Sequence, residues 1–252
     1  MKDFADAYTF GTLDIDGKEF PKILLGTSPF IGAGQFGAKS YVYYKQFYEN
    51  PRNIAKIIIE CVKLGCNAVQ AICCQPILTA IQDAVRATDT QIFIMGSTGL
   101  GEISNEIEAM KQLNAQSIVT HGSYTDRVIN KNPEKLKRTL QGIKDGIIGI
   151  ASYTPGTMIE KAAVIEEVKL MLVPFNKIGV FMDPSFESTL HAAESARRIG
   201  KKIIAMKSLA AGRLEPAVAF QFLKDRVDGI AVGLTNMEEI KETLEVASSY
   251  FG

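Results

Sequence analysis

The sequence has no tryptophan, only two histidines and four cysteines, and no excess of charge of either sign. Its 28 basic and 28 acidic side chains give a formal net charge of zero. Nucleic-acid phosphates are bound by clustered Lys and Arg, so this balance argues against a nucleic-acid partner. The densest basic cluster is Arg197, Arg198, Lys201 and Lys202, which is typical of the last turn of a helix.

Long apolar runs are also absent, because no run approaches the ~18 residues that a membrane-spanning helix requires. Asp3 and Asp6 do not fit the positively charged start of a secretory signal. Four cysteines in 252 residues do not make a disulfide scaffold, so reduced thiols are expected. We therefore predict a cytoplasmic protein with no membrane partner.

What the sequence does contain is one repeated pattern: a polar helical stretch that ends on Gly or Asn, then a short apolar run, then small polar residues. The runs are near-continuously apolar and do not alternate, which is typical of parallel strands buried on both faces. The eight runs are residues 22–25, 68–72, 91–95, 117–120, 147–151, 170–173, 202–206 and 230–232. The eight helical stretches are residues 51–64, 77–88, 102–113, 133–144, 157–168, 187–199, 216–226 and 237–248.

Eight strand-helix units predict an α/β fold, a (β/α)8 TIM barrel that occupies residues 1–252 as a single domain. An open doubly wound sheet is the alternative, since periodicity alone does not show that a barrel closes. Residues 11–20 precede the first unit and predict a short N-terminal β-hairpin with Asp16-Gly17 at its turn. We expect this hairpin to close the bottom of the barrel.

In TIM barrels the pocket forms at the carboxyl ends of the strands, so residues directly after each apolar run are the candidates. His121 is the candidate acid or base, and a structural histidine bonded to a loop carbonyl is the alternative. Lys207 is the second catalytic candidate, for electrostatic, proton-transfer or Schiff-base chemistry. The candidates for substrate binding are Thr27, Gln70, Ser97, Tyr153 and Asn176.

Loops after the last two strands of such barrels often hold phosphate with backbone N–H groups. Gly212, Gly233 and Thr235 are therefore the candidates for binding a phosphate or a cofactor, with helix capping as the alternative for Thr235. Cys73 and Cys74 end the second run. For them, small core residues are favoured over a thiolate-imidazole pair or a metal site with His121, so no metal is predicted.

The longest strand-to-helix connection, residues 32–50, is rich in aromatic side chains between positions 36 and 48. We call residues 36–48 the aromatic segment. Long loops at a barrel mouth are usually functional. A lid over a substrate, a recognition surface, a homo-oligomer contact and a structural wrap all remain open. Residues 32–37 also match Gly-x-Gly-x-x-Gly, but no acidic residue ends the second strand, which disfavours a dinucleotide site of that type.

Residues 202–214 (KIIAMKSLAAGRL) and 229–240 (GIAVGLTNMEEI) resemble the carboxyl half of aldo-keto reductases. Residues 148–155, 173–176 and 24–27 resemble other segments of the same family. The resemblance covers nearly the whole chain and implies the same barrel. It also implies a catalytic Asp, Tyr, Lys and His, of which only the His is matched, at His121.

The other three catalytic positions of the family fall on different residue types here. Its Asp falls on Gln70, its proton-donating Tyr near Gln75, and its Lys near Gly96 or Ser97. The nicotinamide-binding positions differ as well and fall on Ala151, Ser152, Leu172 and Met206, and the basic residue for the adenosine phosphate falls on Thr235. The cofactor is therefore left open, because standard NADP binding is not supported.

We expect an enzyme that acts on a small carbonyl-containing or phosphorylated metabolite, with His121 as acid or base. An atypical NAD(P)-dependent oxidoreductase is one alternative. A non-catalytic protein that binds its partner through the aromatic segment is another.

Overall fold

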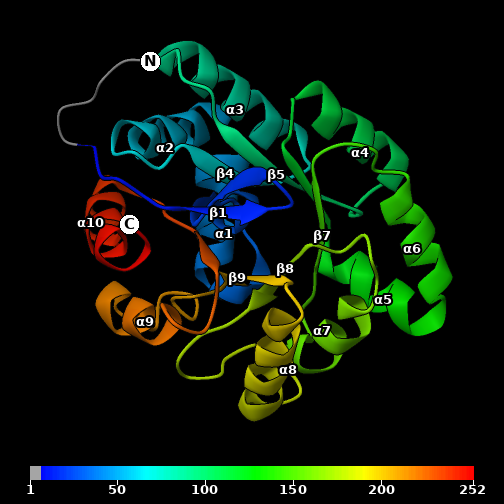
Figure 1. Ribbon diagram of the computed structural model, residues 1–252. Coiled ribbons are helices and arrows are strands. Elements are labelled where there is room, and N and C mark those ends of the chain that lie inside the picture. The colour runs from blue at the N-terminus through cyan, green and yellow to red at the C-terminus, as the bar shows by residue number, and fades with distance from the viewer. Residues whose placement is uncertain (1–6) are drawn as a thin grey trace.

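The computed structural model describes residues 7–252, which form a closed barrel of eight parallel strands preceded by a hairpin (Figure 1). The barrel strands are β3 (Ile23–Gly26), β4 (Ala68–Ile72), β5 (Phe93–Thr98), β6 (Ser117–Thr120), β7 (Ile147–Ala151), β8 (Leu170–Pro174), β9 (Lys202–Met206) and β10 (Gly229–Val232). The last strand, β10, pairs with β3, the first, through Ile230 and Ile23. This pairing closes the barrel, so the predicted TIM barrel is confirmed and an open sheet is wrong.

Helices surround the barrel, as Figure 1 shows. Their buried side chains belong to the hydrophobic core between helices and strands. The eight predicted helices are present as α2 (Pro51–Lys63), α3 (Gln75–Thr88), α4 (Ile103–Gln112), α6 (Pro133–Gln141), α7 (Pro155–Ala163), α8 (Phe186–Arg198), α9 (Pro216–Leu223) and α10 (Met237–Phe251). Several end a few residues earlier than predicted. In residues 7–252 no helix combines the length and the apolar character needed to cross a membrane.

Two local differences from the expected elements affect the site. The third strand was expected at residues 91–95 but lies at Phe93–Thr98, so Ser97 lies inside a strand and not after it. An additional helix, α5 (Gly122–Lys131), directly follows β6. No usual start signal precedes α5, because its N-cap residue is His121 and not Ser, Thr, Asp or Asn.

The predicted N-terminal hairpin is confirmed as β1 (Thr12–Ile15) paired with β2 (Lys18–Pro21). Asp16 and Gly17 both have positive φ, at 54° and 77°, as a two-residue type I′ turn requires. Ile15 and Phe20 are buried in the cluster that fills the barrel interior. The hairpin therefore closes the amino-terminal end of the barrel, which faces the viewer in Figure 1.

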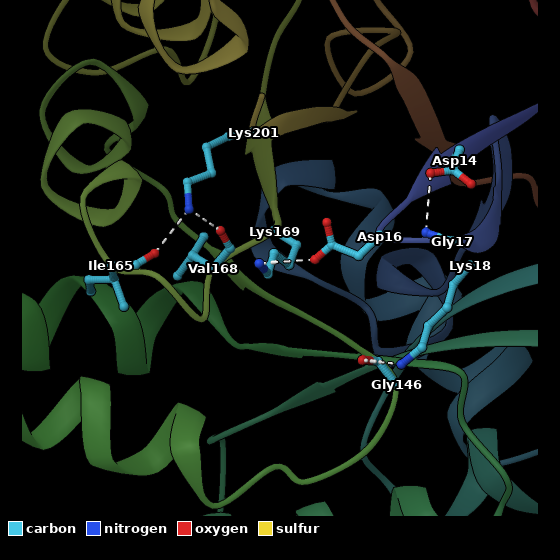
Figure 2. A network of polar contacts seen from close by, with 9 residues as sticks. All are labelled: Asp14, Asp16, Gly17, Lys18, Gly146, Ile165, Val168, Lys169 and Lys201. Atoms are coloured by element: carbon cyan, nitrogen blue, oxygen red, sulfur yellow. Dashed lines mark hydrogen bonds and ion pairs between the residues drawn. The ribbon is translucent and has the colours of Figure 1, made fainter. Parts of the chain in front are cut away.

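Polar contacts attach the hairpin to this end of the barrel (Figure 2). Lys18 donates from Nζ to the carbonyl oxygen of Gly146 at 3.2 Å. Lys169 Nζ lies 2.9 Å from a carboxylate oxygen of Asp16. Lys201 donates nearby to the carbonyls that precede β8. With the amino-terminal end closed in this way, the open end lies at the carboxyl ends of the strands.

The connection that carries the aromatic segment is folded into four short helical pieces. They are η1 (Ser28–Ile31), η2 (Gly34–Phe36), α1 (Lys39–Tyr43) and η3 (Tyr44–Tyr48). Phe30 and Phe47 are fully buried with ring centroids 5.0 Å apart. Tyr41 and Val42 remain exposed. The segment is therefore anchored on its inner side and presents apolar side chains on its outer side.

Candidate functional site

A cavity of about 750 Å³ lies at the carboxyl ends of β3, β9 and β10. Residues 34–39 and Tyr43, from the connection that carries the aromatic segment, form part of its wall. Its charged side chains are of both signs: Lys39, Lys207, Arg213, Glu215, Glu239 and Glu242. The strand-end rule therefore locates a cavity, and the aromatic segment contributes to it.

The structure divides the predicted site residues into two groups. Those that line the cavity are Gln70, Lys207, Gly212, Gly233 and Thr235. Those that do not line it are Thr27, Ser97, His121, Tyr153 and Asn176. Lys207 belongs to the first group and also contacts Tyr153 of the second, so it joins the two.

Three predicted substrate-binding residues are buried, and the side chains of two of them form hydrogen bonds within the barrel. Thr27 Oγ1 accepts the backbone N–H of Ile72 at 3.0 Å, which links the ends of β3 and β4. The Asn176 side chain bonds both backbone groups of Val180, at 2.8 and 3.1 Å, and closes a loop. Ser97 is buried within β5. Each contact satisfies a polar group that would be costly to leave unpaired.

Cys73 and Cys74 are partly buried and pack against the hydrophobic core. Burial raises the pKa of the Cys73 thiol to about 11 and also raises that of Cys74. Both thiols therefore keep their protons near neutral pH, which does not favour a thiolate nucleophile. Within residues 7–252, no group of three or more His, Cys, Asp or Glu side chains is arranged to hold a metal ion.

His121 is fixed by hydrogen bonds at both ring nitrogens. Its Nδ1 accepts the backbone N–H of Ser123 at 3.3 Å, and its Nε2 lies 2.9 Å from the hydroxyl of Tyr153. Burial lowers the pKa of His121 to about 4, so the ring is neutral at pH 7. A neutral ring that accepts at Nδ1 carries its proton on Nε2. His121 therefore donates to the Tyr153 hydroxyl oxygen.

Tyr153 follows β7 and is held from its backbone as well as from its hydroxyl. Its N–H donates to a carboxylate oxygen of Asp126 at 2.9 Å, and Ser152 Oγ donates to the other oxygen at 2.6 Å. Burial, reinforced by the Asp126 charge, raises the pKa of Tyr153 to about 12. The phenol is therefore protonated at neutral pH. Because its oxygen accepts from His121, its own proton is free for another acceptor.

Lys207 follows β9, and its ammonium lies between two aromatic rings. Nζ lies 4.7 Å from the ring centroid of Tyr153 and 4.4 Å from that of Phe181, which are cation–π distances. Lys207 and Phe181 both have positive φ, at 55° and 65°. This region costs a non-glycine residue ~1 kcal/mol or more, and such outliers cluster at functional sites.

The environment of Lys207 also changes its ionisation. Burial lowers the pKa of Lys207 to about 8, against an opposing effect from the charge of Asp183. A group that is partly neutral near physiological pH is able to act both as a base and as a nucleophile.

Two contributors to this site were not predicted. Asp126, which holds Ser152 and Tyr153, lies on the unpredicted helix α5, five residues after His121. Phe181 lies between β8 and α8, and nothing in its sequence context indicated contact with Lys207. Ser208, which the strand-end rule selects together with Lys207, lines the cavity, and its buried Oγ has no hydrogen-bond partner among the described residues.

The expected phosphate position at the start of α10 is already filled by a carboxylate. Thr235 donates from both N–H and Oγ1 to Glu239 Oε2, each at 2.8 Å. Glu239 donates its own N–H to the Asn236 side chain at 2.9 Å. Glu242 also lines this side of the cavity. The adenosine phosphate of NADP does not fit this end, since a second anion there would be repelled.

No protein-family model matches the sequence, and no curated protein sequence matches it. Solved structures do match in fold. A Pseudomonas aeruginosa protein provisionally named an aldo-keto reductase has a TM-score of 0.70 at 19% identity, over 99% of this chain and 98% of that one. An aldo-keto reductase from Brucella melitensis has a TM-score of 0.62 at 11% identity, over 94% and 93%.

A third solved structure, the glycerol dehydrogenase of Gluconobacter oxydans, matches with a TM-score of 0.56 at 14% identity, over 97% of this chain and 96% of that one. Identities this low describe the fold alone. The chain therefore has an aldo-keto reductase-like TIM barrel, as the sequence resemblance predicted, and its chemistry has to be argued from its own residues.

Proposed function

We propose that the protein is an enzyme that acts on a carbonyl-containing small molecule bound in the cavity. The observation that carries this proposal is the contact of Lys207 with Tyr153 and of Tyr153 with His121, at the distances given above. We call these three side chains the Lys207–Tyr153–His121 row. It runs from the cavity wall to the end of β6 and combines a cation, a protonated phenol and a neutral imidazole.

In this proposal each member of the row has a distinct role. Lys207 meets the substrate, because it is the member that lines the cavity. Tyr153 does not line the cavity but lies against Lys207, and we assign it as the acid for a carbonyl oxygen held at Lys207, since its own proton is free. His121 Nε2–H stabilises the phenolate that forms, and the Lys207 ammonium does so from the ring face.

The fold similarity implies a nicotinamide cofactor, but the carboxylates at the start of α10 do not fit its adenosine phosphate. The proposed reaction therefore uses no nicotinamide cofactor. Lyase or isomerase chemistry at a carbonyl needs only the acid and base groups that the row supplies. The free thiols of all four cysteines support a cytoplasmic setting, which we include in the proposal.

An atypical NAD(P)-dependent oxidoreductase is the second candidate, and the barrel shared with aldo-keto reductases favours it. A thermal-shift measurement with NADH and NADPH separates the two, because a ligand that binds only the native state raises its melting temperature. We expect no stabilisation by NADPH. A concentration-dependent rise would replace the first proposal with the second.

The first proposal is tested by screening aldehydes, ketones, keto acids and their phosphorylated forms, followed by variants on the substrate found. Tyr153→Phe should lower kcat/KM by about 10²- to 10⁴-fold, the usual contribution of a positioned acid. Tyr124→Phe is the matched control, because the Tyr124 hydroxyl bonds Thr139 and no member of the row. Equal activity of the two variants would contradict the proposal.

A further inference from the structure

The Lys207 amine differs from the other lysine of the cavity wall. Lys39 is exposed to solvent, whereas Lys207 is half-buried between the rings of Tyr153 and Phe181. Within residues 7–252, no carboxylate oxygen lies within 4 Å of Lys207 Nζ. The ammonium is therefore held by ring faces, with no ion pair that would have to be broken before the amine reacts.

We propose that Lys207 is a nucleophile that forms a Schiff base with the carbonyl carbon of the substrate. This inference rests on the proposed function, because it assumes that the cavity binds a carbonyl compound. It makes the role of Lys207 covalent, whereas the proposed function requires only that Lys207 contact the substrate.

The step balances with the groups present. The lone pair of the neutral Nζ attacks the carbonyl carbon, a C–N bond forms, and a proton moves from nitrogen to the oxygen to give a neutral carbinolamine. Tyr153 then protonates this hydroxyl, which leaves as water while the nitrogen lone pair forms the C=N bond. The products of this step are an iminium cation between the same two rings and a Tyr153 phenolate, and the iminium nitrogen returns the proton to the phenolate to leave the imine. Amine and carbonyl become imine and water, so no oxidant or reductant is needed.

Two further observations support the inference. With a pKa of about 8, about one tenth of Lys207 is neutral at pH 7, far more than for an ordinary lysine. Lys207 also has a positive φ of 55°, and such backbone outliers cluster at functional sites.

The test is trapping with sodium borohydride in the presence of pyruvate or dihydroxyacetone, one anionic and one neutral ketone, followed by peptide mass spectrometry. We expect one reduced adduct, on the peptide that contains Lys207. Lys207→Arg should abolish the adduct while keeping the positive charge, and Lys39→Arg should retain it. If Lys207→Arg does not fold, as judged by thermal melting, Lys207→Met takes its place.

The inference is overturned if neither ketone labels Lys207 above the level of Lys39 in the wild-type protein. Its failure is distinguishable from failure of the proposed function by Tyr153→Phe. No adduct together with loss of turnover in Tyr153→Phe would leave the acid role standing and remove the covalent one. An adduct on Lys207 together with normal turnover in Tyr153→Phe would support the covalent step and remove the acid role.

Discussion

The two basic side chains of the row, His121 and Lys207, are both shifted toward their neutral forms, and burial is the first cause in each case. The pKa of Tyr153 is raised, and this also favours the neutral form, because burial disfavours the charged phenolate. The buried part of the row therefore holds two uncharged donors, the Tyr153 hydroxyl and His121 Nε2–H, beside a lysine that is able to lose its proton near neutral pH.

Stability should depend on pH through His121. Its folded-state pKa of about 4 lies below the ordinary value of 6.5, so the unfolded chain takes up this proton first as the pH falls. The stability linked to the neutral ring is present above pH 6.5 and is lost between 6.5 and 4, by up to about 3 kcal/mol. Urea unfolding at several pH values should show this loss. His121→Gln should flatten the profile in that window, and an unchanged slope would contradict the assignment.

Gly122 sets the position of the Tyr153 ring. A Cβ atom at residue 122 would lie 3.0 Å from two ring carbons of Tyr153, closer than ordinary van der Waals contact. Gly122→Ala should therefore displace the ring from His121 and lower turnover while the barrel stays folded. Gly142→Ala is the control, because Gly142 follows α6 outside the cavity wall and has a helical φ of −71° that alanine adopts without strain. Wild-type activity in both variants, at equal melting temperatures, would contradict this role of Gly122.

At the scale of elements, the strands and outer helices were predictable because each buries apolar side chains at a regular period. Helix α5 was not, since its N-cap is a histidine and its partner Asp126 is recognisable only once the helix exists. The contact between Phe181 and Lys207 could not be predicted from the sequence either. Both residues lie in connections and have positive φ. Glycine is the usual sequence sign of positive φ, and neither residue is a glycine.

The hairpin should contribute to stability through Phe20. This side chain is fully buried, and its ring centroid lies 5.2 Å from that of Phe93 at the start of β5. Phe20→Ala should lower the free energy of unfolding by about 3–5 kcal/mol, measured by urea denaturation. The exposed Thr12 of the same hairpin supplies the control, and Thr12→Ala should change little. A loss below ~1 kcal/mol for Phe20→Ala would show that the hairpin is not part of the packed barrel.

At the scale of the whole molecule, the two ends of the barrel have different roles. The amino-terminal end is closed by the hairpin and its lysine contacts (Figures 1 and 2). The carboxyl-terminal end holds the cavity and the row. Residues of the aromatic segment form part of the cavity wall, and Tyr41 and Val42 are exposed on the outer side of the segment. Self-association through this outer side stays a prediction, as do recognition of another protein and a single-domain chain.

The general location of the site was predictable because parallel strands end together, and this rule selected His121, Tyr153 and Lys207. The rule did not distinguish side chains that face the cavity from those, such as Thr27 and Asn176, that are used in backbone hydrogen bonds. It also could not foresee that Glu239 would occupy the donors of Thr235, since this depends on a side-chain rotamer.

The central claim is that a neutral His121 donates to Tyr153 and leaves the phenol proton free. Long-range ¹⁵N–¹H NMR of the histidine rings tests it without any substrate, and only His121 and His191 give signals. At pH 7 we expect His121 to be neutral with its proton on Nε2. Tyr153→Phe should shift the Nε2 resonance of His121 and leave exposed His191 unchanged. An imidazolium at pH 7, or a proton on Nδ1 of a neutral ring, would contradict the account.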